Sequence, residues 1–411
     1  MIITLIAALT ALLGGGAVAA APVEAVPVPR VGPGDAAFES LDNGLAALMG
    51  EGGIPGGVVA VARRGELAHW QAFGWADREG RIPAGRDTLF RAASVSKPLT
   101  AVAVLRLAEA GRLSLDAPLG ALLPELARDA ADGNIPKITV RQLLGHSGGW
   151  DDGEHDEVAL RDEVRRLARL AGPGGGVTPA DLVRRRFAKP LDFTPGSGHG
   201  YSNFGYVVLG RVIEGVCGGE YARAVQNLVL EPAGCAGPAG IGSPWLAGLM
   251  PGEARYYDYP GAKPVEAALA PGRATPWPDG GIATTTLDAA LGWVACAPCL
   301  ALFTDRTFAA MHGRAGLLGG ETVAVMLARP APLLAGEGEA WYGLGWRVKP
   351  LAGGKYAWHG GSMPGTTALA AHHPSDISVA VLMNSRPRQG AEFSRRLQDC
   401  VEQALNAIAG I

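Results

Sequence analysis

Two pairs of β-like runs lie near opposite ends of this 411-residue chain, and they restrict its fold more than any other feature. Residues 57–62 and 67–75 flank an Arg-Arg-Gly-Glu turn sequence. Residues 367–371 and 377–383 flank a turn that contains proline and aspartate. Short turns between such runs indicate β-hairpins. The chain is therefore expected to contribute a hairpin to a sheet from each of its ends.

Helical periodicity accompanies the hairpins at residues 36–50, 97–110 and 391–408. The middle of the chain contains helical pieces separated by long loops rich in glycine and proline, with its clearest helices at 207–215 and 221–230. We therefore predict an α/β (α+β) fold with one antiparallel β-sheet, flanked by helices and built from both termini. A mostly helical domain is expected to be inserted at roughly 98–280. The whole domain is expected over residues 36–410.

The first 21 residues are uncharged and read as a signal peptide, because an apolar run precedes small residues of the Ala-x-Ala type. Residues 22–35 are rich in proline, glycine, alanine and valine and are expected to be a linker. The chain is thus expected to be exported to the periplasm or the extracellular space. An uncleaved N-terminal membrane anchor is the alternative.

Charge and cysteine content restrict the partners. The net charge is −3 without a basic block, so the electrostatic footprint of a nucleic-acid-binding protein is missing. Cys296 and Cys299 have the CxxC spacing of redox and zinc sites, but no second CxxC or nearby histidine accompanies them. Buried small residues or a local disulfide are the preferred interpretations. We predict no metal site.

Ser94 and Lys97 form an S-x-x-K pattern at the start of the 97–110 helix. Residues at i and i+3 share a helix face, so the hydroxyl and the amine can meet. A serine hydroxyl needs an adjacent base to act as a nucleophile. A lysine serves as that base when burial or a nearby cation favours its neutral form. The pattern alone is common, so its context decides its meaning.

Two further motifs carry groups that suit acyl chemistry. Tyr201 can relay a proton beside a cation, and Asn203 can donate to a substrate carbonyl and fix Lys97. In the third motif of the chain, His359 is followed by Gly360, Gly361 and Ser362, just before the last hairpin. Paired glycines allow the backbone to approach a ligand closely, and a backbone N–H here could form an oxyanion hole with that of Ser94. A solvated loop and a tight turn are the simpler interpretations.

In this order the three motifs resemble those of serine β-lactamases and penicillin-binding proteins, and most closely those of the class C-like β-lactamase-related serine hydrolases, which include esterases and D-amino-acid peptidases. The resemblance covers roughly residues 36–408. Further similar stretches lie at residues 90–100, 143–149, 195–214, 280–285 and 342–346.

The resemblance implies a serine hydrolase that acts on a small ester, amide or peptide without a cofactor. Ser94 would attack the carbonyl and form an acyl-enzyme, and Lys97 and Tyr201 would move the proton. The N–H groups of Ser94 and Ser362 would hold the oxyanion. Asn203 and the segment from His359 to Ser362 would bind the substrate.

His359 departs from the family pattern, which usually has Lys-Thr-Gly or Lys-Ser-Gly as its third motif. Histidine is largely neutral near pH 7, so a fixed charge suited to a substrate carboxylate is missing. This change favours an esterase over a β-lactamase, a D-alanyl-D-alanine carboxypeptidase or a D-aminopeptidase. These activities stay open as alternatives, as does a non-catalytic penicillin-binding-like sensor or scaffold.

Two local patterns offer rival sites. Ser147 lies in a G-x-S-x-G sequence, the nucleophile elbow of α/β-hydrolases, but the segment after it does not look helical. An acidic cluster at residues 151–156 contains one histidine and could bind a metal. A solvated loop is the preferred interpretation, because no helical histidine spacing supports a metal site.

Overall fold

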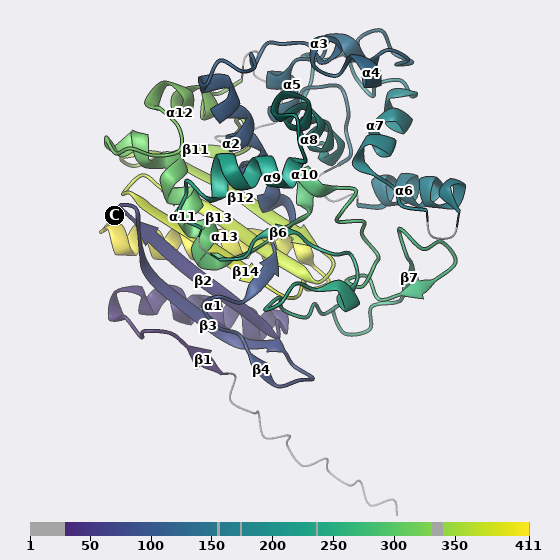
Figure 1. Cartoon of the computed structure of the whole chain (residues 1–411). Helices are drawn as coiled ribbons and strands as arrows, with labels where there is room; N and C mark the ends of the chain where they lie inside the picture. The colour runs from purple at the N-terminus through teal and green to yellow at the C-terminus, as the bar shows by residue number, and fades with distance from the viewer. Residues whose placement is uncertain (1–28, 154–156, 173–174, 236, 331–339, 411) are drawn as a thin grey trace, which may run out of the picture.

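The computed structural model describes residues 29–153, 157–172, 175–235, 237–330 and 340–410. Its main sheet contains β1 (Arg30–Val31), β2 (Gly56–Arg63), β3 (Glu66–Asp77), β10 (Trp341–Tyr342), β11 (Arg347–Leu351), β12 (Gly354–Met363), β13 (Thr366–His373) and β14 (Ile377–Met383), with β4 (Ile82–Pro83) attached to β3. The strand order is β1-β3-β2-β14-β13-β12-β11-β10, and every pairing is antiparallel. Because β2 pairs with β14, the predicted sheet built from both ends of the chain is confirmed (Figure 1).

Both predicted hairpins are present, β2–β3 and β13–β14. In the first, Arg63 pairs with Glu66 across a two-residue turn, and Arg64 and Gly65 have φ angles of 54° and 87°. Positive φ at both central positions is the requirement of a tight turn that matches the strand twist, and glycine meets it without steric cost. The turn thereby fixes the strand pairs next to it, and an irregularity between Val61 and Ala62 shifts the register of the rest of the hairpin.

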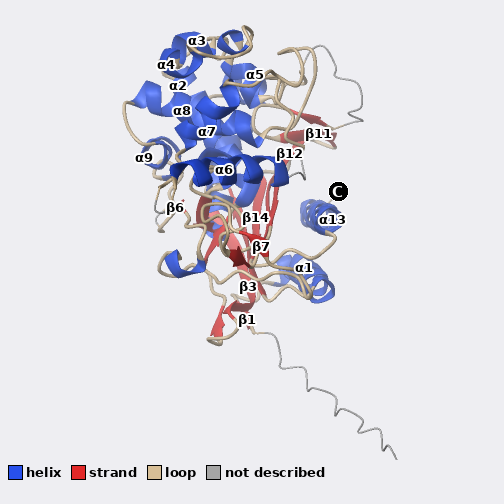
Figure 2. Ribbon diagram, turned by 90° about the vertical axis from the view of Figure 1, so that its right-hand side faces the viewer, coloured by secondary structure: helices blue, strands red, loops and turns tan. Residues whose placement is uncertain are grey.

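The strands of the sheet centre are buried on both faces, so their sequences are nearly continuous apolar runs. Along β2, Val59 and Val61 belong to a core with helices α1 (Glu39–Gly52) and α13 (Gly390–Ala409), whereas Val58 and Ala60 face the opposite core. This alternation is the period of two that a pleated strand imposes. Figure 2 shows α1 and α13 on one side of the strands and most other helices on the opposite side.

On the opposite face, α11 (Ala297–Phe308) packs on β2 and β14. The other helices used below are α2 (Ser96–Glu109), α5 (Val140–Leu144), α6 (Glu157–Ala171), α7 (Pro179–Phe187), α8 (Asn203–Cys217), α9 (Tyr221–Val225), α10 (Asp288–Leu291) and α12 (Gly320–Met326). The helix expected at 221–230 is α9 followed by a π-helical turn, Gln226–Leu230. None of the helices in the described ranges is long and apolar enough to cross a membrane. The expected signal peptide lies outside the described residues, as does the first half of the expected linker, residues 22–28. In its second half, Arg30 and Val31 form β1.

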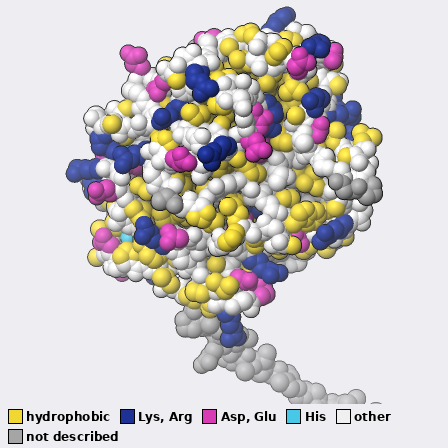
Figure 3. All heavy atoms as spheres, viewed as in Figure 1, with side chains coloured by type: hydrophobic (Ala, Val, Ile, Leu, Met, Phe, Trp, Pro, Cys, Tyr) yellow, Lys and Arg dark blue, Asp and Glu magenta, His cyan; other side chains and the backbone are white. Residues whose placement is uncertain are grey.

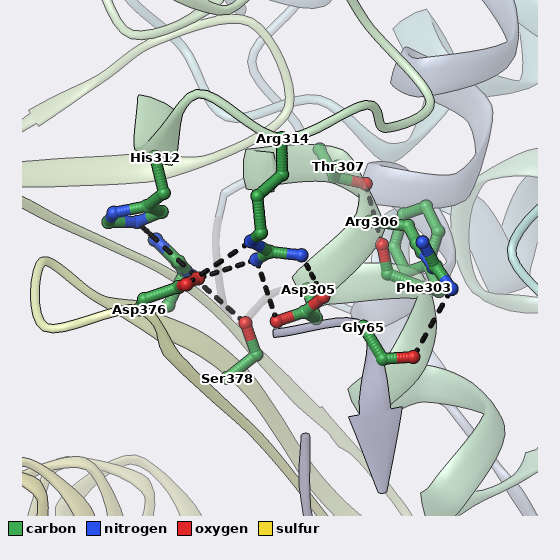
Figure 4. A network of polar contacts seen from close by, with 10 residues as sticks. Gly65, Phe303, Asp305, Arg306, Thr307, His312, Arg314, Asp376 and Ser378 are labelled. Carbon is green, nitrogen blue, oxygen red and sulfur yellow. Dashed lines mark hydrogen bonds and ion pairs between the residues drawn. The ribbon is translucent and has the colours of Figure 1, made fainter. Parts of the chain in front are cut away.

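A polar network ties the end of α11 to the β13–β14 turn. Arg314 bonds both Asp305 of α11 and Asp376 of the turn (Figure 4). His312 Nε2 lies 3.0 Å from Nε2 of buried His372, whose Nδ1 faces the Ser378 hydroxyl at 2.9 Å.

The surface seen in Figure 3 mixes basic and acidic side chains without a large patch of one sign.

A disulfide joins Cys235 to Cys299, and Cys296 is a buried free thiol. Of the two preferred interpretations, a local disulfide between Cys296 and Cys299 is therefore wrong, whereas both residues are buried as the other interpretation expects. Cys299 lies inside α11 and bonds to the segment after the π-helical turn, so the covalent link closes a long loop. Sequence spacing cannot predict such a pairing, because it depends on which elements pack together.

Candidate active site

Ser94 lies on a short 3-10 turn, Ala93–Val95, that leads directly into α2. From Arg91 to Thr100 it is the one residue that is not fully buried. Ala93 has a φ of 46°, in the left-handed region that residues with a Cβ atom rarely adopt. This strained residue directly precedes the hydroxyl that is exposed to the pocket, which is a common feature of functional turns.

Lys97 is completely buried, and its amine faces Ser94. Its Nζ lies 3.0 Å from Ser94 Oγ, 2.7 Å from Asn203 Oδ1 and 3.1 Å from the carbonyl oxygen of Ala290. The last two oxygens can only accept, so the amine must donate to both of them. The remaining direction points at Ser94, where an ammonium would donate and a free amine would accept the hydroxyl proton. The geometry therefore suits proton transfer from Ser94 to Lys97.

A buried ion pair holds the two acceptors of Lys97 together. Asn203 begins α8 and Ala290 belongs to α10, and Arg211 of α8 bonds Asp288 of α10 at 2.7 Å. The two helices that carry these groups, α8 and α10, are distant in sequence. The position of the amine is thus fixed by the packing of three helices and not by the S-x-x-K spacing alone.

Tyr201 lies over Lys97, with the ring centroid 4.8 Å from Nζ. Tyr201, Ser202 and Asn203 are each less than 9% exposed, so the interpretation of this motif as a solvated loop is wrong. Asp152 accepts hydrogen bonds from the Ser202 hydroxyl and the Phe204 N–H, both at 2.8 Å. Asp152 is therefore a buried anchor of the turn that presents Tyr201.

Burial raises the pKa of Asp152, and the Arg186 guanidinium 3.1 Å away opposes that shift. For this aspartate, the interpretation of residues 151–156 as a solvated loop is wrong. Residues 154–156 lie outside the described residues. In the part of the chain that the structure describes, no group of histidine, cysteine and acidic side chains could hold a metal ion.

His146 supports the same turn from behind. Its Nδ1 accepts from the Ser202 N–H at 3.1 Å, and its ring lies 4.4 Å from the ring of Tyr201. Burial, together with the charge of Lys97, holds the pKa of His146 well below its usual range. The G-x-S-x-G sequence thus supplies a packing histidine. Ser147 follows α5, makes a long 3.4 Å bond to the Gln142 carbonyl, and opens no helix.

The motif from His359 to Ser362 lies inside β12 and forms no tight turn. Pairing of β11 with β12 ends at Trp358, and β12 then runs beside the Ser94 turn. A Cβ atom on Gly361 would lie 2.5 Å from the Ala92 carbonyl oxygen, so only glycine allows this approach. Beyond Trp358, the edge of β12 that earlier paired with β11 has no strand beside it and contacts the Ser94 turn instead.

His359 is neutral at this position. Its Nδ1 lies 2.7 Å from the Gly360 carbonyl oxygen and its Nε2 lies 2.9 Å from the Tyr342 hydroxyl. The carbonyl can only accept, so Nδ1 carries a proton, and Nε2 faces the Tyr342 hydroxyl, which also hydrogen-bonds Tyr206. Burial, reinforced by the charge of Lys97, holds the pKa of His359 well below its usual range. The third motif thus provides no cation at neutral pH.

Ser94, Asn203 and Ser362 line one pocket that is narrow and partly open to solvent. The other walls are mostly apolar and come from α6, the 282–291 segment and the end of β12: Leu160, Val164, Ile282, Leu287, Leu291 and Met363. Sequence reasoning did not identify this lining, because no motif marks it. Tyr342 and His146 were visible only as parts of stretches with family resemblance.

A serine–lysine pair at the start of a buried helix, beside a strand edge and an apolar pocket, defines a site suited to acyl transfer. The family model described as Beta-lactamase matches residues 41–402, so the chain belongs to the β-lactamase family.

Similar proteins support the assignment to the β-lactamase family. Esterase EstB of Burkholderia gladioli is 40% identical over a match that covers 47% of this chain and 49% of the esterase. The mitochondrial serine beta-lactamase-like protein LACTB of Homo sapiens is 28% identical, with 47% and 45% of the two chains covered. The chain thus spans about half the length of the curated relatives it matches.

Among solved structures, a D-amino acid amidase from Ochrobactrum anthropi SV3 superposes with a TM-score of 0.68. The match covers 90% of this chain and 99% of the amidase at 21% identity. At that identity the likeness shows the fold alone, which is mixed α and β with a large antiparallel sheet.

Proposed function

We propose that the protein is a serine hydrolase that cleaves esters through an acyl-enzyme on Ser94. The observation that carries this proposal is the 3.0 Å contact between Lys97 Nζ and Ser94 Oγ, with the amine held by two oxygens that can only accept. The match to an esterase at 40% identity supports the same reaction class.

The reaction proceeds in two steps, acylation of Ser94 and hydrolysis of the acyl-enzyme. Ser94 Oγ forms a bond to the carbonyl carbon while its proton passes to Lys97, and the tetrahedral intermediate expels the alcohol, which takes up that proton with the aid of Tyr201. Water then forms a bond to the acyl carbon while its proton passes to Lys97. The second tetrahedral intermediate breaks its bond to Ser94 Oγ, which takes up that proton with the aid of Tyr201, and the acid leaves. The N–H groups of Ser94 and Ser362 stabilise the oxyanion in both steps.

Ester substrates fit this site better than β-lactams or C-terminal peptides. The pKa of His359 is held below its usual range, so the third motif has no charge to pair with a carboxylate near pH 7. The pocket beside Ser94 is lined mainly by aliphatic side chains, which suit an apolar substituent.

Hydrolysis of p-nitrophenyl esters by wild type, Ser94→Ala and Ser147→Ala tests the proposal. We expect Ser94→Ala to lose at least about a thousandfold in kcat, the order found when a nucleophile is removed. Ser147→Ala is the matched control and should retain activity, and a fluorophosphonate should label wild type but not Ser94→Ala. Full activity in Ser94→Ala would contradict the proposal, and faster turnover of nitrocefin than of esters would contradict the substrate class.

We also propose that the protein is exported. The uncharged apolar segment at residues 1–21 supports this localisation, and so does the Cys235–Cys299 disulfide, since such bonds persist in oxidising compartments. Fractionation of expressing cells, with N-terminal sequencing of the product, tests it. A cytoplasmic protein with reduced cysteines and with residues 1–21 still attached would contradict it.

A further inference from the structure

A buried arginine of α6 lines the pocket beside Ser94. Arg161 is 11% exposed at its side chain, and its Nε and Nη1 atoms are buried without a hydrogen-bond partner among the described residues. Its guanidinium carbon lies 5.0 Å from the centroid of the Trp277 ring. A buried guanidinium donor without an acceptor is costly, so this arrangement favours a ligand that supplies one.

The charge of Arg161 is poorly compensated by the protein. Its nearest carboxylate oxygen belongs to Asp162, at 3.5 Å from Nη2. The same oxygen lies only 2.7 Å from Arg165, which also pairs with Glu266 at 3.2 Å. Asp162 and Glu266 therefore neutralise Arg165 first. Arg161 is left as a cation in a mostly aliphatic wall of the pocket, and its enclosed Nε and Nη1 atoms have no hydrogen-bond acceptor among the described residues.

We propose that Arg161 is a specificity residue that binds a carboxylate carried by the apolar part of the ester substrate. This inference rests on the proposed function. The aliphatic walls contact a short hydrocarbon segment, and the planar guanidinium accepts the carboxylate in a bidentate pair. The substrate class is thus the half-esters of dicarboxylic acids, in which one carboxyl group is esterified and the other is free.

The placement of the cation explains how a neutral third motif is compatible with an anionic substrate. In the family pattern the lysine of the third motif lies on the strand beside the serine. Here that strand position is the neutral His359, and the cation lies on helix α6 at another wall of the pocket. A substrate with its carboxylate on the side of α6 is therefore favoured over one with its carboxylate on the side of β12.

Two p-nitrophenyl esters of equal carbon number test the inference: the hexanoate, and the mono-ester of adipic acid. We expect wild type to favour the adipate ester by about tenfold or more in kcat/KM, the effect of a charged hydrogen-bonded pair. Arg161→Gln should lose that preference through KM, so that kcat/KM falls about tenfold further for the adipate ester than for the hexanoate. Arg161→Lys should keep part of the preference, because it keeps the charge.

Arg165→Gln is the matched control, since Arg165 lies one turn further along α6, pairs with Glu266, and does not line the pocket. It should retain the preference for adipate. Equal rates on both esters in wild type would overturn the inference, as would an equal loss on both esters in Arg161→Gln. Either result leaves the proposed hydrolysis intact if the hexanoate is cleaved in a Ser94-dependent manner.

A binding measurement keeps the inference testable if neither ester is cleaved, which would overturn the proposed function alone. Calorimetric titration of Ser94→Ala with adipate monomethyl ester should show binding that methyl hexanoate lacks. The double variant Ser94→Ala, Arg161→Gln should lose that binding. Absence of binding to Ser94→Ala, or undiminished binding to the double variant, would overturn the inference.

Discussion

The amine of Lys97 donates to Oδ1 of Asn203 across 2.7 Å, which joins the nucleophile helix to a helix whose first residue lies 106 positions later. This bond sets the direction of the amine toward Ser94. In the proposed mechanism, it also makes residue 203 a means of controlling the protonation of Lys97 without altering Ser94.

Asn203→Asp should therefore change the pH dependence of the reaction. A carboxylate beside Lys97 favours the ammonium form, so the free amine required for catalysis appears only at higher pH. We expect the acid limb of the kcat/KM profile to move up by about one pH unit or more, the usual effect of an adjacent opposite charge. Asn203→Ala should lower the rate without that upward shift. Profiles of the two variants that coincide with each other would contradict this role.

The close approach of β12 to the serine turn predicts different outcomes at two adjacent glycines. In Gly361→Ala the new methyl group meets the Ala92 carbonyl oxygen, which forces the strand away from the Ser94 turn. We expect a loss of about 1–3 kcal/mol in the free energy of unfolding, with reduced activity. A Cβ atom on Gly360 has nothing within 4 Å, so Gly360→Ala should keep its stability within about 0.5 kcal/mol. Urea denaturation of both variants measures the difference, and equal stabilities would contradict the contact.

Acidification should destabilise the fold through buried histidines. Burial holds the pKa of His372 well below its ordinary value of 6.5, and nearby His312 and His373 add to the effect. The unfolded chain therefore binds more protons than the folded chain below about pH 6.5, and stability falls as the pH decreases through that range. His372→Gln should show a shallower decline when the free energy of unfolding is measured between pH 7 and pH 5. The network that this histidine joins is drawn in Figure 4. An unchanged slope in the variant would exclude His372 as a cause.

The Cys235–Cys299 bond should stabilise the fold measurably. Its ends are 64 positions apart, for which the chain-entropy account gives about 4 kcal/mol. Cys235→Ala should lower Tm under oxidising conditions and remove the sensitivity of Tm to dithiothreitol. Cys296→Ala is the control and should keep that sensitivity, because Cys296 is a free thiol. Sensitivity to dithiothreitol that survives in Cys235→Ala would contradict the pairing.

The elements at the two ends of the chain could be predicted because their signals are local. The hairpin turn around Arg64 and Gly65 could be predicted because a polar, glycine-containing sequence separates two apolar runs. The predicted strands at 57–62 and 377–383 differ from β2 and β14 by one residue at most. Helices α1, α2 and α13 likewise begin and end close to their predicted bounds. An apolar stripe marks α1 and α13, whereas α2 is apolar on nearly all sides and is almost completely buried.

The surroundings of the site could not be predicted, because they depend on contacts between distant segments. The carbonyl of Ala290 accepts from Lys97, yet no side chain at that position distinguishes it in the sequence. Asp152 looked like part of a solvated acidic loop and is buried against Ser202. Arg161 was one of many arginines until the fold placed it in the pocket with Ser94. Motif order predicted which residues would meet, and packing decides how they are held.

The pairing of β2 with β14 has a consequence for synthesis on the ribosome. The N-terminal hairpin emerges early, but its central neighbour is among the last segments to be translated. At about 5–20 residues per second, the apolar strand β2 waits on the order of half a minute for its partner. The β12 strand that completes the serine turn emerges equally late. A nascent chain therefore exposes an unpaired strand edge well before it has any capacity for catalysis.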